Sequence, residues 1–318
     1  MPASRSPYSM PSAPGSGMWQ DAAMNAHPHL AGIGFGLLAY GIWGFFPLFF
    51  RQLAHVSPMD VLSNRAVWAC VFVGLLLTLR RRWSNVLAVL KTPRQLAMLA
   101  LAALLVGSNW LMFLWAVANR QVVASSLGYF LTPLVSVLLG LAVLKERLNR
   151  LELVSVALAL AALANEIVSL GSLPWVSLFL AATFGCYGLV RKQVPVDALS
   201  GLWLETLAML PLCGLWALWQ AQHGHMVFAA HDASTATLLV GAGIITALPL
   251  MAFAAATQRL DLAKLGMLMY INPTLQFLTA VWLFGEALEP ARLVSFGLIW
   301  LGLGIFSWSM WEKYRDRG

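Results

Sequence analysis

Long apolar stretches alternate with short polar connections along most of the chain. Each stretch approaches the roughly 20 residues that an α-helix needs to cross the hydrocarbon core of a bilayer. None of them alternates apolar and polar residues as a barrel strand does. The pattern therefore predicts an all-α integral membrane protein. Its ten transmembrane helices are expected at about residues 31–50, 61–79, 96–118, 122–144, 152–169, 173–190, 199–220, 235–257, 263–284 and 291–310.

The second half of the chain repeats features of the first half at an offset of 140 residues. Pro133 corresponds to Pro273, and Glu146 corresponds to Glu286, and each pair closes a similar apolar run. Each repeat holds five spans, which is an odd number, so the second repeat must enter the membrane from the opposite side. The sequence thus predicts two inverted five-helix repeats, an architecture of solute carriers.

The two repeats are expected to occupy residues 31–169 and 170–311, between two cytoplasmic tails. Residues 1–30 are rich in Pro, Ser, Gly and Ala and lack the apolar core of a signal peptide. We expect them to form a disordered N-terminal tail. Residues 312–318 are the expected C-terminal tail.

The distribution of charged residues predicts how the protein is oriented in the membrane. The chain is 60 % hydrophobic and only 10 % charged, with a net charge of +7. If the N-terminus is cytoplasmic, sixteen of the twenty Lys and Arg fall in cytoplasmic loops and tails, and only Arg51, Arg120 and Arg292 fall outside. This asymmetry predicts that both termini face the cytoplasm. The positive charge is then a topology signal, and we expect no nucleic-acid partner.

Two charged residues lie well inside predicted spans. Arg65 in the second span and Glu205 in the seventh are also 140 residues apart. A charge at the centre of a bilayer costs about 2.5–3.5 kcal/mol on insertion scales, so each needs a partner or a function. They either form a cavity pair, in which Arg65 attracts an anionic group and Glu205 binds a proton, or an ion pair that only locks two spans together. Glu166, near the outer end of the fifth span, is expected to reach headgroups or water without a functional role.

Polar and aromatic residues gather in the middle of several other spans. Asn109 needs hydrogen bonds from neighbouring helices or from a solute, and Trp110 lies too deep for an interfacial belt. The matched residues Pro133 and Pro273 should bend their helices and free backbone carbonyls. The resulting substrate-cavity candidates are Tyr40, Trp43, Arg65, Asn109, Trp110, Tyr129, Thr132, Pro133, Tyr187, Glu205, Tyr270, Asn272 and Pro273, and Glu205 is also the proton-coupling candidate.

Paired glycines mark the first and sixth spans. Gly41 and Gly44 in the first span correspond to Gly185 and Gly188 in the sixth. Glycines three apart let helices approach closely, and they also suit a hinge. The sequence leaves both roles open.

The sequence gives little support for a metal, a cofactor or catalysis. The three cysteines lie in apolar spans without ligand spacing. His223, His225 and His231 lie in the longest external loop without a further ligand at tetrahedral spacing. The P-loop, GxSxG and HExxH patterns do not occur in the sequence. We therefore expect no metal, no cofactor and no catalytic residues.

Several longer motifs resemble one known family. The RarD-type permeases, in the EamA branch of the drug/metabolite transporter superfamily, are similar from about Gly32 to Met310. The resemblance implies a bacterial inner-membrane protein with ten spans and cytoplasmic ends, in a family described as chloramphenicol-sensitive. It also implies a cavity lined mainly by spans one to four and six to nine. The motifs are SNWLMFLWAV, ASSLGYFLTPLVSVLLG, KERLNR, GSLP, YGLVRK and YINP.

These observations favour a secondary transporter that moves a small organic metabolite or drug-like solute by alternating access. The expected partners are that solute and the lipid bilayer, and a homodimer is left open. A passive channel or a lipid scramblase on the same bundle is the alternative. A membrane-embedded enzyme is least favoured, because the spans hold no His and no deeply placed Asp.

Overall fold

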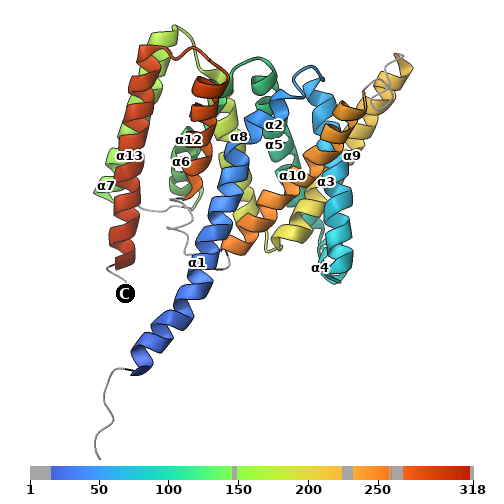
Figure 1. The fold of residues 1–318 in the computed structure, drawn as a ribbon, viewed down its shortest axis with the longest axis horizontal. Helices are drawn as coiled ribbons and strands as arrows, with labels where there is room; N and C mark the ends of the chain where they lie inside the picture. Colours follow the sequence, from blue (N-terminus) through green and yellow to red (C-terminus); the bar gives the residue numbers. More distant parts are fainter. Residues whose placement is uncertain (1–15, 145–148, 224–231, 258, 260–267, 316–318) are drawn as a thin grey trace, which may run out of the picture.

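The computed structural model describes residues 16–144, 149–223, 232–257, 259 and 268–315 (Figure 1). These residues form α-helices, one π-helical segment and short connections, with no strand among them. The elements are α1 (Ser16–Gly44), α2 (Phe46–Arg51), α3 (Pro58–Leu79), α4 (Trp83–Leu90), α5 (Pro93–Ala118), α6 (Val122–Leu144), α7 (Arg150–Leu170), α8 (Trp175–Gln193), α9 (Ala198–Gln222), α10 (Ala233–Thr257), α12 (Ile271–Leu278), the π-helix η1 (Thr279–Leu283) and α13 (Pro290–Arg315).

Seven helical segments within the described residues are long and apolar enough to cross a membrane. They coincide with predicted spans one, two, three, five, seven, eight and ten. Two shorter apolar helices, Val122–Thr132 and Trp175–Arg191, fall at predicted spans four and six. The all-helical membrane class is thus confirmed, while the count of ten stays a prediction. The seven segments are Leu30–Arg51, Pro58–Leu79, Pro93–Ala118, Arg150–Ser169, Ala198–Gln222, Ala233–Phe253 and Pro290–Ser309.

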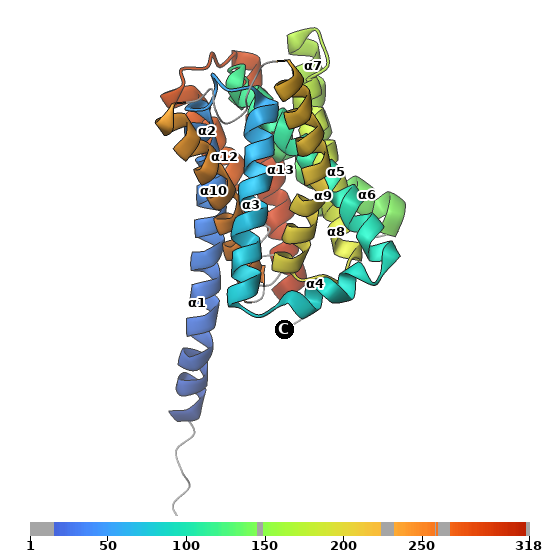
Figure 2. The same cartoon turned by 90° about the vertical axis from the view of Figure 1, so that its right-hand side faces the viewer.

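The N-terminal segment differs from the prediction. Helix α1 begins at Ser16, so residues 16–30 are helical where a disordered tail was expected. Ala and Met recur over this stretch, and both favour helix. The helix projects beyond the bundle in both views (Figures 1 and 2). It ends at Gly44, and α2 follows with Pro47 in its first turn, where a missing N–H is harmless.

The helices pack in matching pairs. We take as counterparts α1 and α8, α3 and α9, α5 and α10, α6 and α12, and α7 and α13, following the predicted repeats. Helix α6 packs on α8 as α12 packs on α1, and α3 packs on α10 as α5 packs on α9. Likewise α1 contacts α10 and α5 contacts α8, while α3 contacts α9, α6 contacts α12 and α7 contacts α13. Exchanging every helix for its counterpart leaves this set of contacts unchanged.

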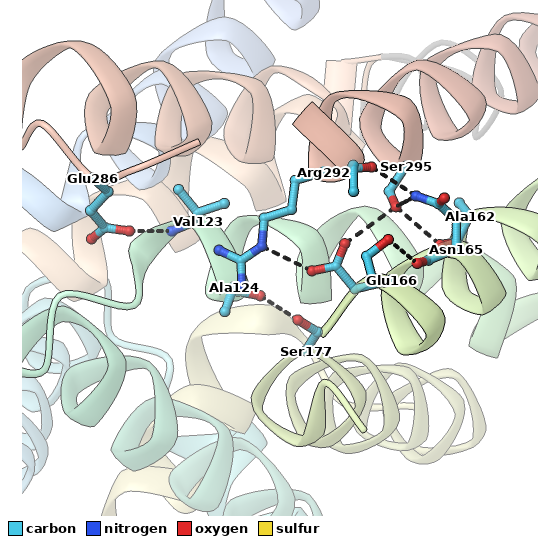
Figure 3. Close-up of polar contacts among 11 residues, drawn as sticks. Val123, Ala124, Ala162, Asn165, Glu166, Ser177, Glu286, Arg292 and Ser295 are labelled. Carbon is cyan, nitrogen blue, oxygen red and sulfur yellow. Dashed lines mark hydrogen bonds and ion pairs between the residues drawn. The ribbon is translucent and has the colours of Figure 1, made fainter. Parts of the chain in front are cut away.

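Helices α7 and α13 form a peripheral pair at one side of the bundle (Figure 1). Their spans are the least buried of the seven. Glu166 on α7 joins them, because Arg292 Nε lies 3.0 Å from Oε1 and Ser295 Oγ donates to Oε2 at 3.2 Å (Figure 3). Glu166 is only 2 % exposed, so the expectation that it reaches headgroups or water is wrong. Glu166 thus links α7 to α13, and the absence of a functional role stays a prediction.

Glu286 ties the end of the predicted ninth span to the start of α6. Its two carboxylate oxygens accept hydrogen bonds from the backbone N–H groups of Val122 and Val123, both at 2.9 Å. The Val123 bond is visible in Figure 3. A carboxylate satisfies the free N–H groups of a helix N-terminus and is favoured by the helix dipole. Its predicted counterpart, Glu146, lies outside the described residues.

Small residues set the closest helix contacts. A Cβ at Gly128 on α6 would lie 2.8 Å from the carbonyl oxygen of Ser177 on α8. A Cβ at Gly44 would lie 2.6 Å from Leu275 on α12, the matching helix pair. Gly44 therefore serves close packing, whereas a Cβ at Gly41 or Gly188 would meet open space.

Candidate functional site

Arg65 lies in the centre of the bundle, two turns into α3. Arg65 is 2 % exposed, and its Nε donates a hydrogen bond to Thr246 Oγ1 on α10 at 2.6 Å. The guanidinium carbon lies 4.0 Å from the centre of the Trp110 ring. A cation over an aromatic face is stabilised by the ring quadrupole, and more so where water is excluded. Trp110 is thus a direct partner of the buried charge.

Two phenylalanines complete the surroundings of the guanidinium. Phe50 and Phe46 on α2 lie with their ring centres 5.2 and 5.5 Å from the Arg65 carbon. The Nη1 of Arg65 has no hydrogen-bond partner among the described residues. The site therefore holds a cation among aromatic rings with one donor free.

Asn109 on α5 joins three helices. Its Nδ2 donates to the carbonyl oxygen of Leu180 at 3.0 Å and to Thr183 Oγ1 at 2.9 Å, both on α8. Its Oδ1 accepts a hydrogen bond from the Tyr129 hydroxyl on α6 at 3.1 Å. Asn109 is fully buried. Of the two sources expected for its hydrogen bonds, neighbouring helices supply them in this conformation.

A continuous row of aromatic rings crosses the centre of the bundle. Phe113 lies 6.1 Å from Phe50 and 6.2 Å from Tyr129, between ring centres. Phe184 then lies 6.0 Å from Tyr129 and 5.7 Å from Tyr187. The row begins beside Arg65 and ends at Tyr187, so it links the first half of the chain to the second.

Glu205 on α9 lies at the far end of this row. The Tyr187 hydroxyl donates to its Oε2 at 3.2 Å, and Arg191 Nε lies 3.3 Å from its Oε1. The Glu205 side chain is 2 % exposed and the Arg191 side chain 19 %. A Cβ at Gly201 would lie 2.5 Å from the Arg191 guanidinium, so glycine there makes room for the ion pair.

The ion pair between Arg65 and Glu205, one of the two arrangements left open by the sequence, is absent from the described structure. Glu205 instead pairs with Arg191, a residue that the sequence placed in a cytoplasmic loop. Arg65 and Glu205 each lie seven residues after the first residue of their helix, a distance of about 10 Å along the axis. Because α3 and α9 begin at opposite ends of the bundle, the two charges are held apart (Figures 1 and 2).

A second aromatic group lies between α1 and α10. Tyr40 is buried, and its ring centre lies 5.5 Å from Trp43 and 6.1 Å from Phe253. Gln276 on α12 lies nearby, with Nε2 donating to Asn272 Oδ1 at 2.8 Å and to the Trp43 carbonyl oxygen at 3.5 Å. Tyr40, Trp43 and Asn272 therefore share one neighbourhood, and Trp43 also packs against the hydrophobic cluster that contains Phe50 and Phe113.

The two matched prolines lie in different local settings. The ninth span is interrupted by a turn at Tyr270, and Pro273 falls in the first turn of the new helix α12. Residues 268–269 are also helical and Tyr270 keeps helical backbone angles, so the break lies about one turn before the proline, as expected where a proline N–H is missing. Its carbonyl oxygen accepts a hydrogen bond from Ser126 Oγ on α6 at 2.7 Å. The side chain of Pro133, within α6, lies outside the described residues. Thr132 is buried and bonds back to the Gly128 carbonyl oxygen.

Tyr270 lines a small apolar cavity between α6, α7, α12 and α13. The cavity measures about 30 Å³, and its other walls include Phe130, Ser155 and Gly302. That volume is about one water molecule's share of the liquid. The cavity is therefore far too small for an organic solute.

The external loop gives no metal site among the described residues. His225 and His231 lie outside these residues, and His223 contacts the carbonyl oxygen of Trp219. Asp232 caps α10, and hydrogen bonds from Thr235 and Ser234 lower the pKa of its carboxyl to about 2.

Sequence reasoning missed several contributors to these groups. Arg191 was hidden because it lies at the predicted edge of a span. Gln276 was overlooked as one polar residue in an apolar run, although it is 2 % exposed. Asp60 was also missed, and it accepts hydrogen bonds from Trp216 and Gln220 of α9, both at 2.6 Å. A search for any polar residue within a span would have found Gln276, whereas Asp60 lies just before the predicted second span.

The helices and the buried polar centre define a multi-pass helical membrane protein, and sequence comparison places it more closely. Residues 30–165 match the EamA-like transporter family. An "Uncharacterized transporter" of Vibrio cholerae is 44 % identical over 87 % of this chain and 91 % of its own. "Protein RarD" of Escherichia coli K12 is 40 % identical over 89 % and 96 %, respectively. A "Chloramphenicol-sensitive protein RarD" of Pseudomonas aeruginosa is 34 % identical over 82 % and 88 %.

The chain belongs to the EamA-like transporter family and is a RarD-type permease of the drug/metabolite transporter superfamily. A solved crystal structure shares its fold, with a TM-score of 0.56 and 22 % identity over 88 % of this chain and 96 % of that one. The relatives are bacterial, so the chain is a multi-pass protein of a bacterial membrane.

Proposed function

We propose that this permease is a secondary transporter of small organic solutes, working by alternating access between two inverted repeats at residues 31–169 and 170–311. The observation that carries the proposal is the set of helix contacts that survives exchange of the two halves. Two halves that pack on each other equivalently have two equivalent arrangements, one open to each side. The distribution of Lys and Arg supports cytoplasmic termini, and the bacterial relatives support an inner-membrane location.

The buried polar centre supports this mechanism because both halves build it. Arg65 bonds Thr246, and Asn109 bonds Thr183, so each bond joins the first half to the second. Buried polar groups in a membrane helix are costly unless they are paired or functional. Polar contacts between two moving bodies are the ones that a solute would replace. We therefore assign the solute site to the row of rings from Arg65 to Tyr187.

Glu205 is our candidate for coupling transport to a proton gradient. Its carboxylate is buried and holds Arg191, which is partly exposed. Protonation of Glu205 would remove the charge that holds the guanidinium and free Arg191 to leave the site. Proton binding would thus be linked to movement between α8 and α9.

The experiment is solute counterflow in proteoliposomes, using a solute found by thermal-shift screening of the purified protein. A carrier gives saturable counterflow, whereas a channel or scramblase gives none. Glu205→Gln should keep counterflow and lose the pH dependence of net uptake. Glu166→Gln is the matched control, because it alters another buried acid in the peripheral helix pair. An unchanged pH profile in Glu205→Gln would remove Glu205 from the mechanism, and absence of counterflow for every solute would refute the carrier.

Other functions receive less support. Members of transporter families are generally not enzymes. The spans hold buried groups that bond to one another rather than an exposed nucleophile beside a base. A homodimer is compatible with the apolar outer surfaces of the helices, and nucleic acid is not expected to bind.

A further inference from the structure

The first observation is that Arg65 has no carboxylate partner among the described residues. Among the described acids of the neighbouring helices, Glu205 is paired with Arg191, and Asp60 accepts hydrogen bonds from Trp216 and Gln220. Arg65 is bonded only to a neutral hydroxyl and surrounded by aromatic rings. A buried cation without an anion is strongly destabilising. No described carboxylate forms an ion pair with Arg65, because Asp60 on the same helix is bonded to neutral groups of α9, and a bound anion would supply that partner.

The second observation is a second free donor on the same face of α3. The indole Nε1 of Trp68 is buried and has no hydrogen-bond partner among the described residues, like Nη1 of Arg65. Residues three apart lie on one side of a helix. Both side chains face α10, since Arg65 bonds Thr246 and the Cβ of Trp68 lies against Gly243. The two residues thus lie one turn apart on the side of α3 that contacts α10.

The third observation is the apolar character of the rest of the site. Phe46, Phe50 and Trp110 surround the guanidinium, and Phe113 extends the aromatic surface away from it. A carboxylate has two oxygens and accepts bonds from two donors, and arginine recognises it better than lysine does. A flat apolar group attached to that carboxylate would pack against the rings.

We infer that Arg65 and Trp68 form an anion-binding subsite that takes the carboxylate of an aromatic monocarboxylate. This inference rests on the proposed function and names its substrate class. The solute carboxylate supplies the ion-pair partner that Arg65 lacks among the described residues. Its ring occupies the aromatic surface formed by Phe46, Phe50 and Phe113. Binding would bridge α3 and α10, which belong to different halves of the chain.

The test compares acids with their neutral amides on the purified, detergent-solubilised protein. The probes are benzoate, phenylacetate and 3-phenylpropionate, each beside its amide, at constant ionic strength and pH 7.5. At least one acid should raise the melting temperature, and its amide should not. Trp68→Phe keeps the ring and removes the donor, so the acid concentration giving half the shift should rise about tenfold, the equivalent of about 1.4 kcal/mol. Trp308→Phe, on peripheral α13, is the control and should bind as the unaltered protein does.

Arg65→Lys tests the charge separately from the geometry of the guanidinium. It should weaken acid binding at least tenfold while keeping the positive charge. If this variant does not fold, the acid–amide comparison and Trp68→Phe still decide the question. Equal shifts with acids and amides, or no shift with any acid, would overturn the inference, as would unaltered binding by Trp68→Phe. Counterflow of a neutral solute alone would also overturn it while leaving the transporter proposal intact.

Discussion

Removal of the Glu286 carboxylate tests how the two halves of the chain are joined at one end of the bundle. Glu286 accepts hydrogen bonds from the N–H groups of both Val122 and Val123 at 2.9 Å. In Glu286→Ala both donors lose their partner at the start of α6. A hydrogen bond to a charged group is worth about 1.5–3 kcal/mol, and loss of a helix cap costs about 0.5–2 kcal/mol. Because Glu286 is half-buried and water can replace part of the contact, we expect a loss of about 2 kcal/mol.

The assay is thermal unfolding of the purified protein in detergent. A loss of about 1 kcal/mol lowers the melting temperature by about 2–4 °C in domains of 150–250 residues. Glu286→Ala should therefore melt about 4–8 °C lower, and Glu286→Gln, which keeps one acceptor, should fall between the two. Glu289→Ala is the matched control, because that acid is exposed and lies three residues away. Equal melting temperatures for Glu286→Ala and Glu289→Ala would refute the cap.

Two further predictions concern helix packing. Gly128→Ala should lower stability by about 1–3 kcal/mol, because the new Cβ would lie 2.8 Å from the Ser177 carbonyl oxygen. In Gly188→Ala the new Cβ meets open space, so this control variant should keep the stability of the unaltered protein. Thermal unfolding of the two purified variants measures the difference. In the peripheral pair, Arg292→Met should destabilise the protein by leaving Glu166 buried without its cation, and Arg292→Met combined with Glu166→Leu should recover much of the loss. Equal stability of the single and double variants would show that this ion pair contributes little.

The sequence predicted the helices well because each span is a long, uniform signal. An apolar stretch of about twenty residues in a bilayer forms an α-helix, because a helix satisfies its own backbone hydrogen bonds. Most predicted helix bounds therefore agree with the structure within a few residues. The ninth span begins outside the described residues, so its extent stays a prediction, but the turn within it was not visible in the hydropathy pattern. Its apolar pattern continues through Tyr270, and hydropathy alone does not report a turn within an apolar run.

The sequence predicted several residues of the buried centre, but it did not predict their hydrogen-bond and ion-pair partners. Arg65, Asn109, Tyr187 and Glu205 all lie in the buried centre, because a polar residue inside a span must find a bond. Which bond it finds depends on the depth of each residue and on where its helix begins. That is why Glu205 pairs with Arg191, and the 140-residue spacing could not reveal it.

Accessibility of the buried centre from both sides of the membrane tests the central claim most directly. Ala66 is fully buried next to Arg65, and it belongs to a hydrophobic cluster against which Trp110 and Tyr187 pack. In a background where the three native cysteines are serine, Ala66→Cys would be exposed to a membrane-impermeant thiol reagent in right-side-out and inside-out vesicles. Alternating access predicts labelling from both sides, slowed by a transported solute. Labelling from one side only, or none from either side, would contradict the account.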